Sequence, residues 1–600
     1  WFNRYLPFLA TVAAIALIAI VLPGRQPETV QDTATDLTTD FSDVELEDTT
    51  EGNVAAKVPT RVLGTNKSLP STQTGVLTFE EAKKKGAALV ANCDSGTGAV
   101  MIPSRFAPPC TQKFSGTNAG KTWQGVDSKT IDVVWFTIEG NPAVDAFLAA
   151  AGADDSPEQV QQTVRDWGKL YETHFNTWGR TVKWHFVDAT GDASDDQAAL
   201  SDARKIANEI KAFAVIGASN NTMVNELVAR KVMCFCTTSL PIELYLKWSP
   251  YVWTSLMAST QGYIHRGEYI AKRLAGRNAI WAHDDVNPLQ SFKDEKRRFF
   301  FLYYDTDDHS YKSGADFFVK YMKDKYGITI PPDAVSQYNG YPDIQRTQEQ
   351  SPGIIQKMLS SYGGQGSTSV ICSCDPFGPA FFTKDAETQR YGPEWIITGS
   401  ALTDTAFFAR TYNQAQWRHA FGISYLAARL DEEKGGAARL YKWHYNKFPP
   451  PAEAGYGLIN APINQFYNGV HMAGPSLTPS SYRSGMYRLP LTGKGGITTI
   501  AQSYGDKGLW PWKDDPIAAD DATEVWWDAD ASGPAEVGGI EGNGLYRYVA
   551  MGKRYLAGEW PSSLPLAFNK KNTALIYEDP PKADQWPCYP SPATKKKDLC

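Results

Sequence analysis

Residues 213–223 read FAVIGASNNTM, and this stretch decides the fold. Four apolar residues run directly into Gly217, which opens a cluster of small hydrogen-bonding residues. A short apolar run that ends at glycine is typical of a buried strand. The residues that follow, NTMVNELVARK (221–231), have helical spacing. The stretch is therefore predicted to be a strand, a polar turn and a helix inside a large α/β domain.

The same alternation continues on both sides of this stretch. Strands are predicted at IDVVWFTI (131–138), TVKWHFVDAT (181–190) and VMCFCTTS (232–239), and helices at SPEQVQQTVRDWGKLYETHF (156–175) and DDQAALSDARKIANEIKA (195–212). Ser156 as N-cap and Pro157 in the first turn mark where the first of these helices begins. Strands that alternate with helices indicate a parallel sheet with crossover connections.

A second run of the same kind follows. Its strands are RRFFFLYYD (297–305), STSVICSC (367–374) and EWIITGS (394–400), and its helices include YKSGADFFVKYMKDKYG (311–327) and IIQKMLSSYG (354–363). A second parallel sheet is therefore expected, and the helix in PYVWTSLMASTQGYIHRGEYIAKRLAG (250–276) connects the two. Beyond Ala401 the chain continues with a helix in INQFYNGVHMAGP (463–475) and strands or hairpins in EVWWDADASG (524–533) and GLYRYVAMGKRYLAGEWP (544–561).

Polar residues follow several of the predicted strands. GASNN (217–221) and CTTS (236–239) follow strands of the first lobe, and CDPFGP (374–379) and TGSALTD (398–404) follow strands of the second. Ligands of open parallel sheets bind beyond the carboxyl ends of the strands, where helix N-termini present free N–H groups. N-capping alone would also explain Ser219 and Asn220. The recurrence across two lobes favours a binding cleft between them.

Composition limits the function classes. The chain has 600 residues, 42% of them hydrophobic, which is enough for two or more domains. Its formal net charge is −7, and it has no long Lys/Arg block. A nucleic-acid partner is therefore not expected. The glycine-rich run GTNAGKT (116–122) is one residue short of a phosphate-binding loop and follows no apolar strand.

The N-terminal region is predicted to anchor the protein in a membrane. Residues 6–22 form an apolar run with Arg4 before it, and no cleavage motif follows closely. Residues 1–24 are therefore expected to be an uncleaved signal-anchor. Residues 26–56 contain no Lys or Arg and many Asp, Glu and Thr. A disordered acidic tether is expected over 25–75, since such a composition buries too little apolar surface to fold.

The eight cysteines fall into two kinds. Cys93 with Cys110, and Cys588 with Cys600, bracket loop-rich segments and are expected to form disulfides in an oxidising compartment. The C-x-C pairs are expected to be buried thiols, because a bridge between strand neighbours two apart strains the backbone. A four-thiolate zinc site is the alternative, although zinc ribbons usually use C-x₂-C. The members of these pairs are Cys234, Cys236, Cys372 and Cys374.

Six stretches together resemble the type I periplasmic-binding proteins, in the Leu/Ile/Val-binding branch of ABC-importer receptors. Their order along the chain carries the resemblance, which covers roughly Cys93 to Pro561 and points to a larger secreted member. The stretches are TVKWHFVDATGDASDDQAALSDARKIANEIKAFAVIGASNNTM (181–223), PYVWTSLMASTQGYIHRGEYIAKRL (250–274), YYDTDDHSYKSGADFF (303–318), EWIITGSALTDTAFFAR (394–410), FYNGVHMAGPSL (466–477) and the extension CDSGTGAVMIPSRFAPPCTQKFSGTNAGKTWQGV (93–126).

The resemblance implies two α/β lobes, each a parallel sheet flanked by helices, joined by three crossings and closing on a small solute. Lobe 1 would comprise 131–265 and 405–475, and lobe 2 would comprise 266–404 and 476–570. A disulfide-linked extension (76–130) would precede them, and a C-terminal tail with a disulfide (571–600) would follow.

The resemblance also implies the solute contacts. The solute carboxylate would be held from lobe 1 by Ser219, Asn220, Thr237, Thr238 and Ser239. Tyr311 matches the aromatic position of lobe 2. The usual acid that pairs with an ammonium group would fall near Ser400, where no acid stands, and this departure puts simple branched-chain amino acids in doubt. Asp375 or Asp404 could substitute for it.

The function implied is that of an extracytoplasmic solute-binding protein of an ABC importer, with no catalysis and no cofactor. Its partners would be a small polar solute (an amino acid, amide or carboxylate), an ABC permease and the membrane. One alternative is a membrane-anchored surface sensor or adhesion subunit on the same fold. A remote alternative is a haloacid-dehalogenase-like phosphohydrolase that would use Asp305 and Asp307 with magnesium. That chemistry fits poorly, because Thr383-Lys384 lies inside a predicted helix.

Overall fold

The computed structural model describes residues 75–139, 156–236, 239–287, 291–307, 309–341, 343–400, 402–450, 453–536 and 539–597. The predicted signal-anchor (1–24) and almost all of the predicted tether (25–75) lie outside them. Across the described part of the chain, no helix combines the length and the apolar character that a membrane crossing requires.

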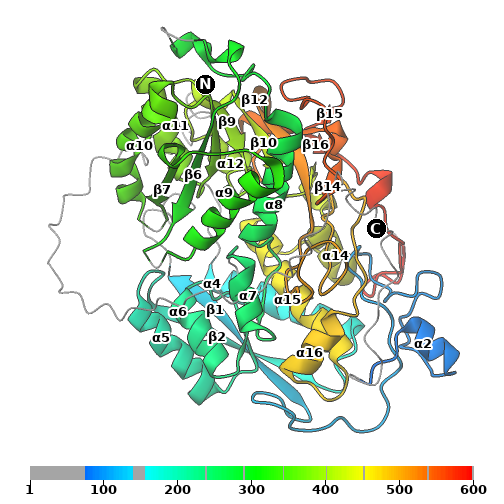
Figure 1. The fold of residues 1–600 in the computed structure, drawn as a ribbon. Helices are drawn as coiled ribbons and strands as arrows, with labels where there is room; N and C mark the ends of the chain where they lie inside the picture. Colours follow the sequence, from blue (N-terminus) through cyan, green and yellow to red (C-terminus); the bar gives the residue numbers. More distant parts are fainter. Residues whose placement is uncertain are drawn as a thin grey trace, which may run out of the picture. The chain divides into compact units, whose positions relative to one another are not determined.

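The first sheet is parallel and has five strands. Its order is β2-β1-β3-β4-β5, and all neighbouring strands run parallel. This confirms the parallel sheet predicted from the alternating pattern. Figure 1 shows its longest strands with helices beside them. The strands are β1 (Thr130–Glu139), β2 (Thr181–Asp192), β3 (Ala214–Ile216), β4 (Met233–Phe235) and β5 (Val252–Trp253).

Alternate side chains of these strands enter two different cores. Val133 and Ile216 belong to one apolar cluster, while Val134 and Val215 belong to the other. A strand places successive side chains on opposite faces, so both faces of this sheet are covered. The first cluster includes α4 (Pro157–His174), α14 (Gly436–Tyr445), α15 (Glu453–Ala473) and α16 (Pro479–Met486), and the second includes α5 (Asp196–Lys205), α6 (Asn221–Ala229) and α7 (Ile242–Trp248).

The second sheet has a parallel part and an antiparallel extension. Its order is β15-β13-β12-β10-β9-β8-β6-β7, with β14 paired to β12. Strands β7, β6, β8, β9 and β10 are parallel, and the β12–β13 hairpin is antiparallel to β10. The strands are β6 (Phe299–Asp305), β7 (Val335–Asn339), β8 (Ser369–Ser373), β9 (Glu394–Ile397), β10 (Ala420–Ser424), β12 (Asp521–Pro534), β13 (Glu541–Val549), β14 (Arg554–Leu556) and β15 (Thr573–Ala574).

A third apolar cluster surrounds the second sheet. Trp395, Trp526 and Trp527 are buried in it, so the Trp-rich C-terminal region contributes to this core. The main helices packed there are α9 (Lys312–Tyr326), α10 (Ile344–Gly364) and α11 (Gly378–Thr388). Shorter elements are α2 (Phe79–Lys84), α12 (Ala406–Ala409), α13 (Gln414–Trp417), β11 (Arg429–Leu430) and β16 (Ile576–Tyr577).

The chain passes three times between the first lobe, built on the first sheet, and the second lobe, built on the second sheet. The first passage is α8 (Ser259–Tyr269), in which every residue is buried. The second follows β11 and leads to α14, and the third lies between Ile517 and Ala522. The second passage comes later than residue 405, where the sequence placed it. The apolar strand AFGIS (420–424) is β10, which extends the second sheet before the chain returns.

Candidate functional site

The two sheets have the same strand order around the position where ligands of parallel sheets bind. The order β2-β1-β3-β4-β5 is repeated by β7-β6-β8-β9-β10 in the second sheet. In this order, successive crossovers leave in opposite directions between β1 and β3, and again between β6 and β8. A crevice at the carboxyl ends of the strands opens at such a switch point. Each lobe therefore has one expected ligand edge.

The two switch points meet in space. The Nδ2 group of Asn221, the first residue of α6, donates a hydrogen bond of 2.5 Å to Ser310 Oγ in the turn after β6. Tyr311, the next residue, packs on Tyr304 with ring centroids 4.8 Å apart and also against the apolar cluster of the first lobe. Residues nearly a hundred positions apart in the sequence thus bring the carboxyl edges of β3 and β6 together.

Ser219 lines a small cavity of about 20 Å³ at the carboxyl ends of β1, β2 and β3. Gly217 makes the turn before it possible. Its φ is 105°, and a Cβ at this position would lie 2.4 Å from the carbonyl oxygen of Phe136. Only glycine allows this approach of backbone to backbone. The other residues lining the cavity include Phe136, Ile138, Ala189, Asp192 and Asn220.

The neighbouring predicted residues of the first lobe have protein partners. The Asn220 side chain caps α6 by accepting from the Met223 N–H at 3.1 Å, and it donates to Ala193 O at 3.1 Å. Ser239 Oγ donates to Met257 O at 2.5 Å. Thr237 and Thr238 lie outside the described residues. Among the predicted contacts that the structure describes, Asn220 and Ser239 thus bond to other parts of the protein. Ser219 is left as the candidate contact that lines the cavity.

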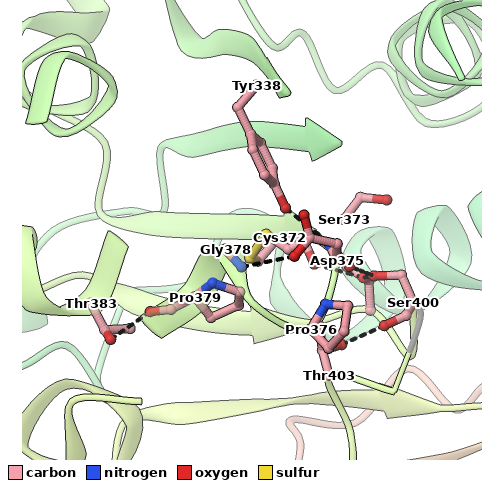
Figure 2. Close-up of a disulfide and its surroundings, with 12 residues drawn as sticks. Tyr338, Cys372, Ser373, Asp375, Pro376, Gly378, Pro379, Thr383, Ser400 and Thr403 are labelled. Carbon is pink, nitrogen blue, oxygen red and sulfur yellow. Dashed lines mark hydrogen bonds between the residues drawn. A yellow bond between two sulfur atoms is a disulfide. The ribbon is translucent and has the colours of Figure 1, made fainter. Parts of the chain in front are cut away.

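In the second lobe, Asp375 organises the turn after β8 (Figure 2). Its carboxylate accepts from the backbone N–H groups of Phe377 (2.7 Å), Gly378 (2.8 Å) and Tyr341 (3.1 Å). The side chain is buried, and this burial raises the pKa of the carboxyl above its ordinary value. The carboxylate thus holds the start of α11 and joins it to the turn after β7.

Ser400 and Asp404 follow β9. Ser400 Oγ donates to Cys374 O at 2.8 Å and lies beside the disulfide in Figure 2. Asp404 accepts from Ser424 Oγ at 2.5 Å, and its Oδ1 has no partner in the described part of the chain. Burial raises the pKa of Asp404 to about 6. The structure therefore gathers Asp375, Ser400 and Asp404 at one edge of the second sheet.

Arg266 is a residue of this edge that the sequence analysis missed. It is 4% exposed and projects from α8 toward the ends of β8 and β9. Its Nη1 donates to Ser373 Oγ at 2.9 Å, and its Nε donates to Thr398 O and Tyr425 Oη, both at 3.1 Å. The sequence did offer a signal for this residue: an arginine lies on the helix that was predicted to connect the two lobes.

The prediction of thiols at the C-x-C pairs is wrong. Cys234–Cys236 and Cys372–Cys374 are disulfides, with Cα atoms 5.4 and 5.1 Å apart. Side chains at positions i and i+2 share a face, and the second cysteine of each pair lies just past the end of its strand, β4 or β8. There the backbone leaves the pleat, and the Cα atoms come within disulfide range. Among the described residues, no cluster of metal-binding side chains occurs.

The predicted Cys93–Cys110 disulfide is confirmed, with Cα atoms 5.6 Å apart. Cys600 lies outside the described residues, so its pairing with Cys588 stays a prediction.

Mass spectrometry of non-reduced, alkylated peptides should show an intact internal disulfide in the peptide holding Cys234 and Cys236, and another in the peptide holding Cys372 and Cys374. Both pairs are buried, so neither should be alkylated until the chain is denatured and reduced. Surface thiols generated by partial reduction serve as the labelling control. Alkylation of either pair in denatured, unreduced protein would contradict the assignment.

Asp305, one of the two acids of the phosphohydrolase alternative, makes its hydrogen bonds within its own turn. Its carboxylate accepts from Thr306 N–H (3.0 Å) and Tyr311 N–H (3.1 Å) and contacts His309 Nδ1 (3.1 Å). Thr383 lies inside α11, as predicted, and donates to Pro379 O. The helix therefore keeps Thr383 from the position that phosphoryl transfer would require.

Comparisons with known proteins agree with this architecture. No family model and no curated relative matches the chain. Similar solved structures include an ABC-transporter solute-binding protein from R. palustris in complex with 4-hydroxybenzoate, which is 12% identical with a TM-score of 0.43 and covers 72% of this chain and 99% of that chain. Another is LivJ from Streptococcus pneumoniae in complex with isoleucine, which is 13% identical with a TM-score of 0.41 and covers 70% of this chain and 100% of that chain.

A periplasmic binding protein from Burkholderia mallei is 11% identical, with a TM-score of 0.44, over 72% of this chain and 96% of that chain. All three neighbours are two-lobed α/β binding proteins.

Proposed function

We propose that this protein is an extracytoplasmic solute-binding protein of an ABC importer. It binds a small polar solute between the carboxyl edges of its two parallel sheets and performs no chemistry on it. An ABC permease is its partner, and the N-terminal apolar segment anchors it to the membrane. Three disulfides within the described residues support an oxidising compartment.

The observation that carries the proposal is the contact between the two switch points. The hydrogen bond from Asn221 to Ser310 joins the ligand edge of the first lobe to that of the second. A solute held between two such edges is surrounded by strand-end polar groups from both lobes. Ser219, Thr238 and Tyr311 are proposed as its contacts, while Asn220 caps α6 beside Ser219 and Asp375 holds the start of α11.

A thermal-shift screen tests the proposal on the intact chain. The library contains amino acids, their amides, urea, short carboxylates and aromatic acids, including the isoleucine and 4-hydroxybenzoate that two structural neighbours bind. A bound solute stabilises the folded protein by mass action, about 2.7 kcal/mol at a hundredfold excess over Kd. A rise in Tm that saturates with concentration is expected for one chemical class.

The variant Ser219→Ala should weaken that binding by roughly 1–3 kcal/mol, because a buried solute oxygen loses its donor. Its own Tm should hardly change. Ser360→Ala, at an exposed position of α10, is the matched control and should bind normally. Calorimetric titration measures both. Normal binding with early melting of Ser219→Ala would place Ser219 in a structural role, and turnover of any solute would defeat the binding-only reading.

A further inference from the structure

Arg266 is a buried cation that forms no ion pair with a described acid, although Asp404 lies near enough to interact with its charge. Its three hydrogen bonds go to a hydroxyl, a backbone carbonyl and a phenol, all of them neutral groups. Within the part of the chain that the structure describes, no carboxylate forms an ion pair with it, and its Nη2 makes no hydrogen bond. A buried charge is strongly unfavourable unless it is paired and its donors are used.

The other buried arginines of the second lobe show how the fold usually compensates a buried guanidinium charge. Arg273 pairs with Glu524 at 2.8 Å, and Arg297 pairs with Glu394 at 2.7 Å. Arg554 pairs with Asp521 at 2.8 Å. Among the described residues, Arg266 has neither an acid within ion-pair distance nor a full set of acceptors, and of these arginines it is the one placed at the proposed solute edge.

The groups around Arg266 indicate which class of ligand its unused hydrogen-bond donors would bind. The guanidinium lies over the Tyr263 ring, 4.8 Å from its centroid, and near the Tyr425 ring at 5.8 Å. These rings and the three hydrogen bonds fix the plane of the group. Its free donors are therefore pre-oriented for a planar oxyanion, which arginine binds in bidentate fashion.

The charge balance favours a carboxylate over a phosphate. One carboxylate neutralises one guanidinium. A phosphate monoester carries −1.5 to −2 near neutral pH. Its excess negative charge would be buried near two further acids of this edge, Asp305 and Asp404, which are 2% and 3% exposed. A monoanionic carboxylate leaves no such excess.

We propose that Arg266 binds the carboxylate of the transported solute at the carboxyl ends of β8 and β9. The inference rests on the proposed function and names the substrate class: small carboxylic acids, rather than amides or urea-like compounds. Ser373 and Tyr425 orient the guanidinium, and the solute carboxylate supplies the ion-pair partner that none of the described acids provides.

Matched acid and amide pairs test the inference by calorimetric titration of the intact protein. The pairs are benzoate with benzamide, 4-hydroxybenzoate with 4-hydroxybenzamide, and isoleucine with isoleucinamide. For the pair whose acid binds, the amide should bind at least tenfold more weakly. Arg266→Met should weaken the acid by ten- to a hundredfold and leave the amide unchanged, while Arg266→Lys should keep part of the preference for the acid.

Stability in the absence of solute separates a binding role from a structural one. Arg266→Met removes an uncompensated charge, so its Tm should equal or exceed that of the natural chain. Arg273→Met, two turns further along the same connection, removes the partner of buried Glu524 and should melt markedly earlier. Early melting of Arg266→Met to the same extent would overturn the inference.

The two proposals fail in different ways. If an acid binds the natural chain and binds Arg266→Met equally well, only the carboxylate inference is overturned. If the natural chain prefers an amide to its acid, the same conclusion holds. If no member of the solute library binds the natural chain, the solute-binding function itself is overturned, and the inference falls with it.

Discussion

Replacing Arg297 with methionine is expected to lower the free energy of unfolding by about 3–5 kcal/mol. Arg297 and Glu394 form a bidentate ion pair, with Nε–Oε2 at 2.7 Å and Nη2–Oε1 at 2.8 Å, and both side chains are fully buried. Glu394 is the first residue of β9. The substitution therefore leaves a carboxylate without its countercharge in the centre of the second lobe.

Urea denaturation followed by tryptophan fluorescence measures this loss. The double variant Arg297→Met/Glu394→Gln is the matched control. It removes both charges, and the glutamine amide can still accept from the Trp281 N–H through its oxygen and donate to Ser369 Oγ through its nitrogen, at the two places where Glu394 now accepts. Most of the lost stability should return in it, since a buried pair is costly mainly when it is broken on one side. A loss below about 1 kcal/mol in the single variant would contradict the assignment.

The variant Asp520→Asn is expected to be more stable than the natural chain at pH 8 and to lose this advantage toward pH 4. Asp520 is fully buried, and it accepts from Ser503 Oγ (2.6 Å) and Trp510 Nε1 (2.8 Å). Burial raises the pKa of its carboxyl to about 8, against the effect of these two hydrogen bonds. The folded protein therefore holds a proton here that the unfolded chain has already released.

The sign follows from proton linkage. Between about pH 4 and pH 8 the folded state binds more protons at this site than the unfolded state, so stability falls as pH rises through this window. The slope is at most about 1.4 kcal/mol per pH unit. Asparagine has no proton to lose, so its advantage over aspartate should grow by several kcal/mol across the window. The charged neighbours that face Asp520 are Asp515, Asp521 and Lys507.

Urea midpoints at pH 5, 6, 7 and 8 measure the difference between the two chains. Asp521→Asn is the contrasting control. It removes the carboxylate that pairs with buried Arg554 at 2.8 Å, so it should destabilise the protein throughout this range. A constant difference between Asp520→Asn and the natural chain from pH 5 to pH 8 would show that Asp520 is already ionised in the folded state.

Much of the fold could be read from local patterns. The predicted strand at 131–138 is β1, and the predicted helix at 156–175 is α4, capped by Ser156 with Pro157 in the first turn. Both signals are local, because strand and helix periodicity and N-capping involve residues at most a few positions apart. The polar turn at 217–221 was likewise visible in the sequence, as was its place at the end of a strand.

The candidate site was only partly visible in the sequence. The strand-end position of Ser219 follows from the alternation of strands and helices. The bonds from Tyr341 to Asp375 and from Ser239 to Met257 do not, because these partners come from loops elsewhere in the chain. Arg266 was missed because its significance depends on an absence: none of the described carboxylates forms an ion pair with it, whereas Arg273 and Arg297 have their acids.

The sequence by itself determined that this chain forms alternating strands and helices in two successive sets, with polar residues after the strands. Each of these features depends on the periodicity and the types of residues within a few positions of one another, so a short stretch of sequence is enough to specify it. Only the tertiary structure decided that Asn221 meets Ser310, that Cys372 bridges to Cys374 at a strand end, and that Arg266 is buried with no ion pair to a described acid. These depend on which groups the packed backbone brings together and on the cost of burying charge, and neither is encoded in any short stretch of the chain.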